Sequence, residues 1–118
     1  MAFESLDGQT LYYTKTPGGS SPLFARRLSG GSERQVLESV YGRALVMAAR
    51  GIYYIEQAGA DGKFPLKSYQ FASGTSSLVT LIDADVYGGL AVSGNEKQVL
   101  YVINTPRTAD LELVENFQ

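Results

Sequence analysis

The sequence predicts an all-β protein built from repeated, antiparallel, four-stranded units. Three observations carry this prediction: short segments rich in β-branched and aromatic residues, glycine-containing turns between them, and similar tripeptides that recur at intervals of 41 to 48 residues. Asp-Gly, Pro-Gly and Gly-Asn pairs supply the tight connections between strands. No stretch of helical length has a convincing apolar face of helical period, and the nearest, residues 33–41, is better interpreted as a strand.

Two families of tripeptides define the repeat. Residues 40–42, Val-Tyr-Gly, recur 46 positions later as residues 86–88, and a small and aliphatic run follows each copy. An aliphatic residue followed by tyrosine begins at Leu11, Ile52 and Leu100, at intervals of 41 and 48. The chain therefore divides into units at residues 2–39, 40–85 and 86–118, the last without its outermost strand. The expected strands are 2–5, 10–16, 22–29 and 34–39, then 43–49, 51–57, 66–72 and 77–82, then 89–93, 98–104 and 110–116.

A family resemblance rests on three segments. Residues 5–13, Ser-Leu-Asp-Gly-Gln-Thr-Leu-Tyr-Tyr, resemble the Ser-Pro-Asp-Gly turn signature of TolB-like and WD40-like β-propeller repeats, with Leu6 in the place of proline. A degenerate copy occupies residues 93–100, and residues 48–54 carry a shortened turn. Residues 109–117 are similar to the closing segment of the C-terminal propellers of bacterial winged-helix transcriptional regulators. The resemblance implies β-propeller blades and leaves the ligand open, because propellers host many functions.

The length of the chain sets the expected assembly. Propellers have typically four to eight blades, whereas 118 residues at about 45 per blade give about 2.6. The fold is therefore expected to be incomplete in one chain and completed by homo-oligomerisation, which hides the apolar faces of the end blades. A homodimer with six blades is favoured over a trimer with nine. A protein or small-molecule ligand is the other partner considered.

Composition excludes several function classes. The sequence has no His and no Cys, which excludes imidazole bases, thiol nucleophiles, Cys/His zinc sites, haem and iron–sulfur ligation, and disulfides. Its 10 basic and 12 acidic residues, with no basic run longer than Arg26-Arg27, argue against nucleic-acid binding. Residues 1–7 are no signal peptide, and the apolar run 44–49 is too short to cross a bilayer. We expect no cofactor, no metal, no membrane contact, and a cytoplasmic location.

Repeated tyrosines give the candidate ligand site. Tyr41 and Tyr87 recur where one unit passes to the next, which in a propeller is the rim of the central channel, and with Arg43 they suit stacking on a sugar or binding a peptide. Repetition also favours a structural role, in which each ring wedges between blades. The pairs at residues 12–13 and 53–54 fit strands with one ring between sheets and the other partly exposed.

The remaining candidates have structural interpretations. Asp83 and Asp85 have the chemistry of a cation or acid–base site, but no third ligand follows at a fixed spacing. Residues 59–63 superficially match a phosphate-binding loop, and a hairpin tip explains them better. The serine pairs at 20–21 and 76–77 have no His to activate them. Arg26, Arg27 and Arg34 form a basic cluster that a solvated strand edge explains.

The sequence thus predicts a non-enzymatic propeller fragment that assembles into a closed ring and serves as a scaffold or an interaction module. The alternative is a small oligomeric, lectin-like, carbohydrate-binding propeller, which the lack of Trp disfavours. An enzyme ranks last because no catalytic residue is evident.

Overall fold

The computed structural model describes residues 2–15, 19–42, 44–83, 86–92, 98–104 and 109–115, with side chains up to Asp83 and at Leu90. This part of the chain consists of antiparallel strands joined by turns, without a helix, which confirms the all-β prediction. The strands are β1 (Ala2–Glu4), β2 (Thr10–Tyr13), β3 (Ser20–Arg27), β4 (Arg34–Tyr41), β5 (Leu45–Met47), β6 (Gly51–Ile55), β7 (Phe64–Gln70), β8 (Thr75–Ile82), β9 (Val86–Val92), β10 (Gln98–Asn104) and β11 (Ala109–Glu115).

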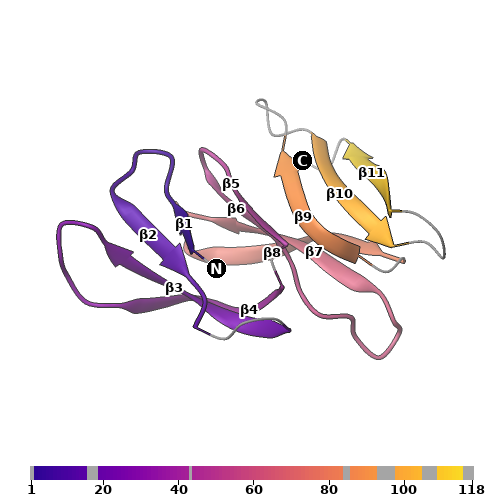
Figure 1. Ribbon diagram of the computed structural model, residues 1–118, viewed down its shortest axis with the longest axis horizontal. Helices are drawn as coiled ribbons and strands as arrows, with labels where there is room; N and C mark the ends of the chain where they lie inside the picture. The colour runs from indigo at the N-terminus through magenta and orange to yellow at the C-terminus, as the bar shows by residue number, and fades with distance from the viewer. Residues whose placement is uncertain are drawn as a thin grey trace.

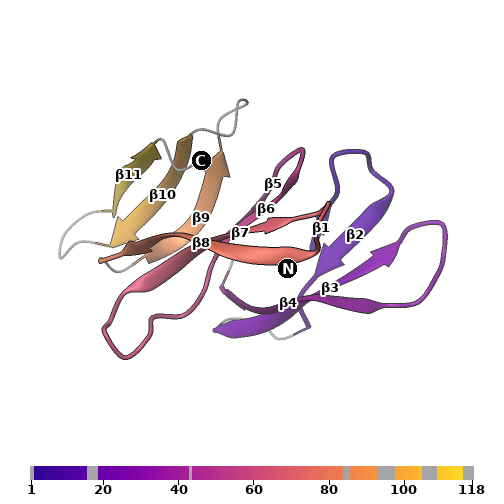
Figure 2. The ribbon, with the colours of Figure 1, turned by 180° about the vertical axis from the view of Figure 1, so that it is seen from behind.

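Consecutive strands pair to form three sheets. Sheet 1 has the order β1-β2-β3-β4 and sheet 2 the order β5-β6-β7-β8, while sheet 3 comprises β9, β10 and β11 with β10 in the middle. Figure 1 shows the three sheets following one another along the long axis, with sheet 2 between the other two, and Figure 2 shows the same row from behind. The predicted blade-like sheets are therefore present. Their completion by further copies of the chain is not part of this structure.

The turn between β1 and β2 shows how local chemistry ends these strands. The Ser5 hydroxyl donates a hydrogen bond to the Asp7 carboxylate, which also accepts the Gln9 N–H at 3.0 Å. The Ser5 Oγ accepts the Thr10 N–H at 3.1 Å, and Gly8 takes a φ of 70°, a region in which glycine is unstrained. The short polar side chains thus satisfy backbone groups that strand pairing leaves free.

Strand β6 of sheet 2 is buried on both faces because sheet 2 lies between the other two sheets. Ile52 and Tyr54 of β6 pack into a cluster shared with sheet 1, whose members include Tyr12 and Leu23. The alternate β6 residues, among them Tyr53, pack into a second cluster that Leu90 of β9 joins from sheet 3. All five residues of β6 are buried. The expectation that one ring of each tyrosine pair is partly exposed holds for residues 12–13 and is wrong for residues 53–54, where each ring serves a different interface.

Gly51 begins β6 where this strand passes very close to the backbone of β7. A Cβ at this position would lie 1.8 Å from the backbone oxygen of Tyr69 on β7. The preceding turn is also tight, because the Ala48 N–H donates to the Gly51 carbonyl at 2.8 Å, which limits β5 to Leu45–Met47 instead of the predicted 43–49. Among the described residues no helix has the length and hydrophobicity needed to cross a membrane.

Candidate functional site

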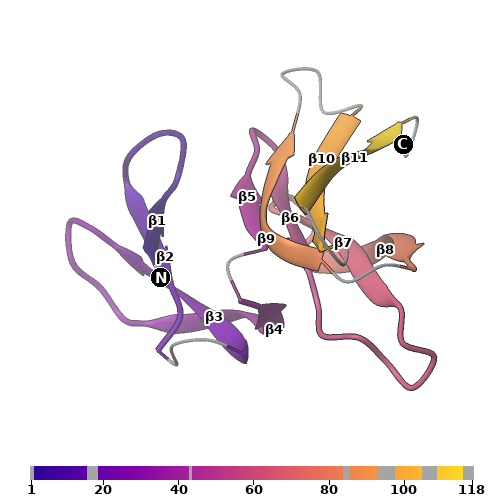
Figure 3. The same ribbon diagram turned by 45° about the vertical axis from the view of Figure 1, so that its right-hand side comes forward.

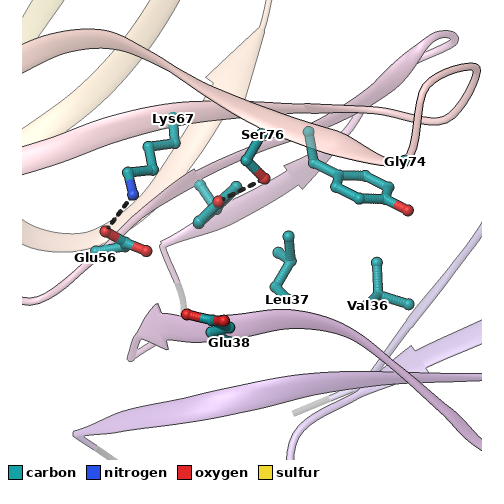
Figure 4. A pocket seen from close by; sticks show the side chains of 9 residues that line it. Val36, Leu37, Glu38, Glu56, Lys67, Gly74 and Ser76 are labelled. Atoms are coloured by element: carbon teal, nitrogen blue, oxygen red, sulfur yellow. Dashed lines mark hydrogen bonds and ion pairs between the residues drawn. The ribbon is translucent and has the colours of Figure 1, made fainter.

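A cavity of about 230 Å³ lies between sheets 1 and 2. Figure 4 shows its walls: β4 of sheet 1 on one side, and strands of sheet 2 on the other. The β4 side contributes two aliphatic residues and a carboxylate, and the sheet 2 side contributes hydroxyl and charged groups. The lining residues are Val36, Leu37, Glu38, Tyr54, Glu56, Lys67, Tyr69, Gly74 and Ser76.

An ion pair forms the charged corner of this cavity. Lys67 Nζ lies 2.8 Å from Glu56 Oε1, and both side chains are largely but not fully covered, with 30% and 25% of their surfaces exposed. The hydrogen bond to Glu56 raises the pKa of the Lys67 ammonium above its ordinary value, and burial opposes this increase. Strand pairing preorganises this ion pair. Lys67 lies directly opposite Tyr54 in the β6–β7 register, so Glu56, two residues beyond Tyr54, lies next to Lys67.

A hydroxyl pair forms the second polar element. The Tyr54 hydroxyl donates to Ser76 Oγ at 2.8 Å. Burial raises the pKa of the Tyr54 phenol, so the group stays protonated at neutral pH. The two hydroxyls offer both donor and acceptor capacity to a bound molecule.

Glu38 supplies an uncommitted carboxylate on the opposite wall. It lies on β4 and is exposed, and in the described part of the chain no hydrogen bond or ion pair engages it. Figure 4 shows it across the cavity from the Lys67–Glu56 pair. Counting Glu38, Glu56 and Lys67, the cavity carries a net charge of −1. Its chemistry therefore suits a hydroxyl-rich, uncharged molecule better than an anion.

Sequence reasoning missed these cavity residues. Glu38 and Lys67 belong to different sheets, and only the packing of one sheet on the other brings them together. The one available signal was the length of the β6–β7 hairpin, since a tip at residues 59–63 would have placed Tyr54 opposite Lys67.

The three predicted rim residues are placed as follows. Tyr41 ends β4 and is half-buried, with its ring centroid 5.2 Å from that of Phe64, so it packs against the cluster that contains Tyr53 and Phe64. Arg43 lies outside the described residues. Tyr87 lies on β9, and its side chain also lies outside the described part of the chain. A ligand role for the three stays a prediction.

The other candidates fall in turns and strand ends. Residues 59–63 form the β6–β7 hairpin tip, as expected, with the Gly62 N–H donating to the Gly59 carbonyl at 3.0 Å. Asp83 is exposed and Asp85 is outside the described residues, among which no three potential metal-ligating side chains cluster. The Ser20 hydroxyl donates to Gln57 Oε1 at 3.0 Å. Three exposed arginines lie on sheet 1: Arg26, Arg27 and Arg34.

Comparison with known proteins identifies a fold. No protein-family model matches the chain, and no curated protein matches it. Among solved structures, a "putative 6-phosphogluconolactonase" from Bacteroides fragilis is similar, with a TM-score of 0.51 and 14% sequence identity. The likeness is one of fold. It covers 98% of this chain and 37% of the other, so the chain spans well under half the length of that protein.

This finding corrects two predictions. The assignment to TolB-like or WD40-like repeats and to winged-helix regulators is wrong, because no such family model matches and the similar structure is described as a lactonase. The prediction of a non-enzymatic scaffold, with a lectin-like alternative, is contradicted by the same match to a protein described as an enzyme. The physical reason lies at residues 5–10. Their hydrogen bonds show turn chemistry that many hairpins share, so the motif identifies a turn and not a family.

Proposed function

We propose that the chain supplies three blades of a lactonase-like β-propeller and binds an uncharged, hydroxyl-rich lactone in the cavity between sheets 1 and 2. The observation that carries the proposal is the uncommitted Glu38 carboxylate facing the Lys67–Glu56 pair across a cavity of about 230 Å³. The fold likeness to a protein described as a 6-phosphogluconolactonase supplies the class of ligand.

Charge distinguishes the proposed ligand, a neutral lactone, from a phosphorylated lactone. A phosphorylated lactone would bring a charge of about −2 into a cavity whose own charge is −1, and the one ammonium group is already paired with Glu56. A neutral sugar lactone avoids this repulsion. Its hydroxyls can donate to Glu38, while its carbonyl can accept from the Ser76 hydroxyl, whose oxygen already accepts from Tyr54. Val36 and Leu37 provide an apolar wall for the carbon ring.

Binding and hydrolysis are separate in this proposal. The matching structure is much longer than this chain, so turnover is assigned to the protein with its full set of blades. A single copy of the chain, with three blades, binds the lactone without accelerating its hydrolysis.

Titration of the chain with gluconolactam, a hydrolysis-resistant analogue of gluconolactone, tests the site. Two-dimensional amide NMR should show saturable shifts near Glu38 and Ser76. Replacing Glu38 by Gln should weaken binding about fivefold, the equivalent of ~1 kcal/mol for a hydrogen bond to a partly solvated carboxylate. Glu4→Gln is the matched control, because Glu4 is exposed on β1 and lines no part of this cavity.

Two further measurements decide the ligand and the chemistry. The 6-phosphate of the lactam should bind more weakly than the neutral lactam, and tighter binding of the phosphate would contradict the charge argument. Proton release from gluconolactone should proceed at the spontaneous rate when the chain is added in its monomeric form. Absence of saturable lactam binding, or an unchanged affinity in Glu38→Gln, would refute the site.

A further inference from the structure

The internal repeat allows each position of sheet 1 to be compared with its counterpart in sheet 2. Residues 11–13 of β2 correspond to residues 52–54 of β6, because both are an aliphatic residue followed by two tyrosines. The register agrees: Tyr13 lies opposite Phe24, and Tyr54 lies opposite Lys67. Phe24 therefore corresponds to Lys67. Comparing the two sheets therefore shows which face is covered by a neighbouring sheet in sheet 2 and is left uncovered in sheet 1.

The compared positions differ in burial. Ile52 and Tyr54 face sheet 1 and are 0% and 3% exposed. Their counterparts Leu11 and Tyr13 are only half-buried, and neither belongs to a cluster that another described sheet covers. Figure 3 shows sheet 1 at the end of the row, with no other sheet beyond it. Sheet 1 thus has a face that is built like an interface between sheets and has no sheet on it in the described part of the chain.

We call this surface the outer face of sheet 1 and define it by Leu11, Tyr13, Phe24 and Arg26. Cross-strand pairing places Leu11 opposite Arg26, and Tyr13 opposite Phe24. The rings of Tyr13 and Phe24 lie side by side, with centroids 6.2 Å apart. These four residues form a small aromatic and aliphatic surface with one cation.

The margin of the outer face holds the two rings in place. Lys15 Nζ lies 4.4 Å above the centroid of the Phe24 ring and 2.6 Å from Glu33 Oε2. The Tyr13 hydroxyl also donates to Glu33. These contacts order the face before any partner arrives, which lowers the entropic cost of docking.

A hollow lies beside Leu11 and Arg26 of the outer face. A cavity of about 240 Å³ is lined by Leu11, Arg26, Arg27, Leu28 and Gly30, and Leu28 is 53% exposed. Leu11 belongs both to the hollow and to the outer face, so the hollow continues the apolar surface, and a contiguous apolar surface is typical of a docking site. The flanking arginines give this surface a positive margin.

We infer that the outer face of sheet 1 docks a sheet from a second copy of this chain, as the opposite face of sheet 1 already docks sheet 2. Sheet 3 supplies a complementary row. In the repeat Tyr101 corresponds to Tyr12 and Tyr53, which face the next sheet along the chain. The β10–β11 register places Glu112 opposite Tyr101 and Asp110 opposite Ile103. The backbone register thus gives sheet 3 two acidic residues at the positions paired with Tyr101 and Ile103, opposite in charge to Arg26 of the outer face.

Such a contact joins unlike surfaces of two copies. Its two sides are sheet 1 of one chain and sheet 3 of another, so the contact is head-to-tail and either closes on a small number of copies or continues. Two copies supply six sheets and three copies supply nine. The homodimer, favoured from the sequence, and the trimer are therefore the two assemblies that this face supports.

Light scattering coupled to size-exclusion chromatography tests the inference on the purified chain. The expected mass is two or three times the chain mass of 12.8 kDa, with a shift toward 12.8 kDa on dilution. Arg26→Glu should raise the dissociation constant at least tenfold, because it reverses a charge at the contact. Phe24→Glu should do the same through the apolar part of the face. Arg50→Glu, an equal charge reversal at an exposed turn of sheet 2, should leave the mass unchanged.

Circular dichroism confirms that each variant is folded, and because Arg26 is exposed its replacement spares the core. A wild-type chain that remains at 12.8 kDa up to millimolar concentration overturns the inference, as does an Arg26→Glu variant that assembles as the wild type does. Lactam binding between sheets 1 and 2 is measured separately in the monomeric variants. Failure of the docking surface and failure of the proposed function therefore give different results.

Discussion

Replacement of Gly51 by alanine is the sharpest test of how sheet 2 is packed. A Cβ at this position would lie 1.8 Å from the oxygen and 2.9 Å from the carbon of the Tyr69 carbonyl. Ordinary contact begins near 3.4 Å. The backbones of β6 and β7 would have to separate by about 1.6 Å, and no flexible side chain is available to absorb the change.

The expected cost follows from two opposing contributions. Overpacking of a rigid interior costs about 3 kcal/mol when backbone atoms must move. Alanine also restricts the unfolded chain, which returns about 0.5 to 1 kcal/mol. Gly51→Ala should therefore lower the free energy of unfolding by about 2 to 2.5 kcal/mol. The disturbed pair, Gly51 opposite Gln70, lies at the end of the β6–β7 ladder, so the surface exposed on unfolding should not change. The loss of stability should therefore appear as a lower denaturation midpoint with an unchanged denaturant slope.

Urea unfolding followed by circular dichroism measures this difference. Gly59→Ala is the matched control, because its Cβ would meet only Asp61 Oδ1, at 3.5 Å, in a hairpin tip. That variant should unfold within about 0.5 kcal/mol of the wild type. If Gly51→Ala also falls within 0.5 kcal/mol, the close approach of β6 to β7 is not a feature of the protein in solution.

Three further outcomes are expected. Leu66→Ala, at a side chain with no exposed surface, should cost about 3 kcal/mol in urea unfolding, whereas Leu78→Ala, at a side chain 56% exposed, should cost less than about 0.5. The hydrogen bond from Ser5 lowers the pKa of the Asp7 carboxyl, so its contribution to stability is present above the ordinary value near 3.8 and is lost as the pH falls through the folded value. The stability difference between wild type and Asp7→Asn should therefore be larger at pH 7 than at about pH 2.5, and equal differences at both would contradict this. Burial raises the pKa of Tyr54 above 10.0, so its contribution is present below that pH and is lost at higher pH. Tyr54→Phe should lose less stability than the wild type between about pH 9 and 12, and parallel losses would refute that account.

Local patterning was sufficient to place the strands. The segment 98–104 was expected as a strand and is observed as Gln98–Asn104, because a continuous run of aliphatic and aromatic residues between two polar amides fixes its extent. The predicted strand at 10–16 ends earlier, at Tyr13. The predicted strand at 34–39 extends further, to Tyr41, where it pairs with Ser20 of β3. Pairing partners, which one segment cannot reveal, decide these ends.

Features that depend on contacts between sheets could not be predicted. The half-exposed ring expected at residues 53–54 assumed a sheet with one wet face, and the neighbour on each side removes that face. The sequence around Glu38 did not indicate a site, because Glu38 lines the cavity only through the packing of sheet 2 opposite it. The family assignment also failed at this level. Turn residues are selected by local backbone geometry, so they do not identify a family, which is defined by similarity over the whole fold.

The tyrosine doublet of β6 sets how stability is distributed along the chain. Tyr53 is committed to one neighbouring sheet and Tyr54 to the other, so two adjacent residues carry separate nearest-neighbour couplings. Stability then resembles that of a one-dimensional array, in which the middle unit is held from two sides and a terminal unit from one. Opening sheet 2 must break both couplings at once, and β6 amides should therefore exchange with solvent more slowly than those of β2. A unit added at either end would stabilise its neighbour by one such coupling.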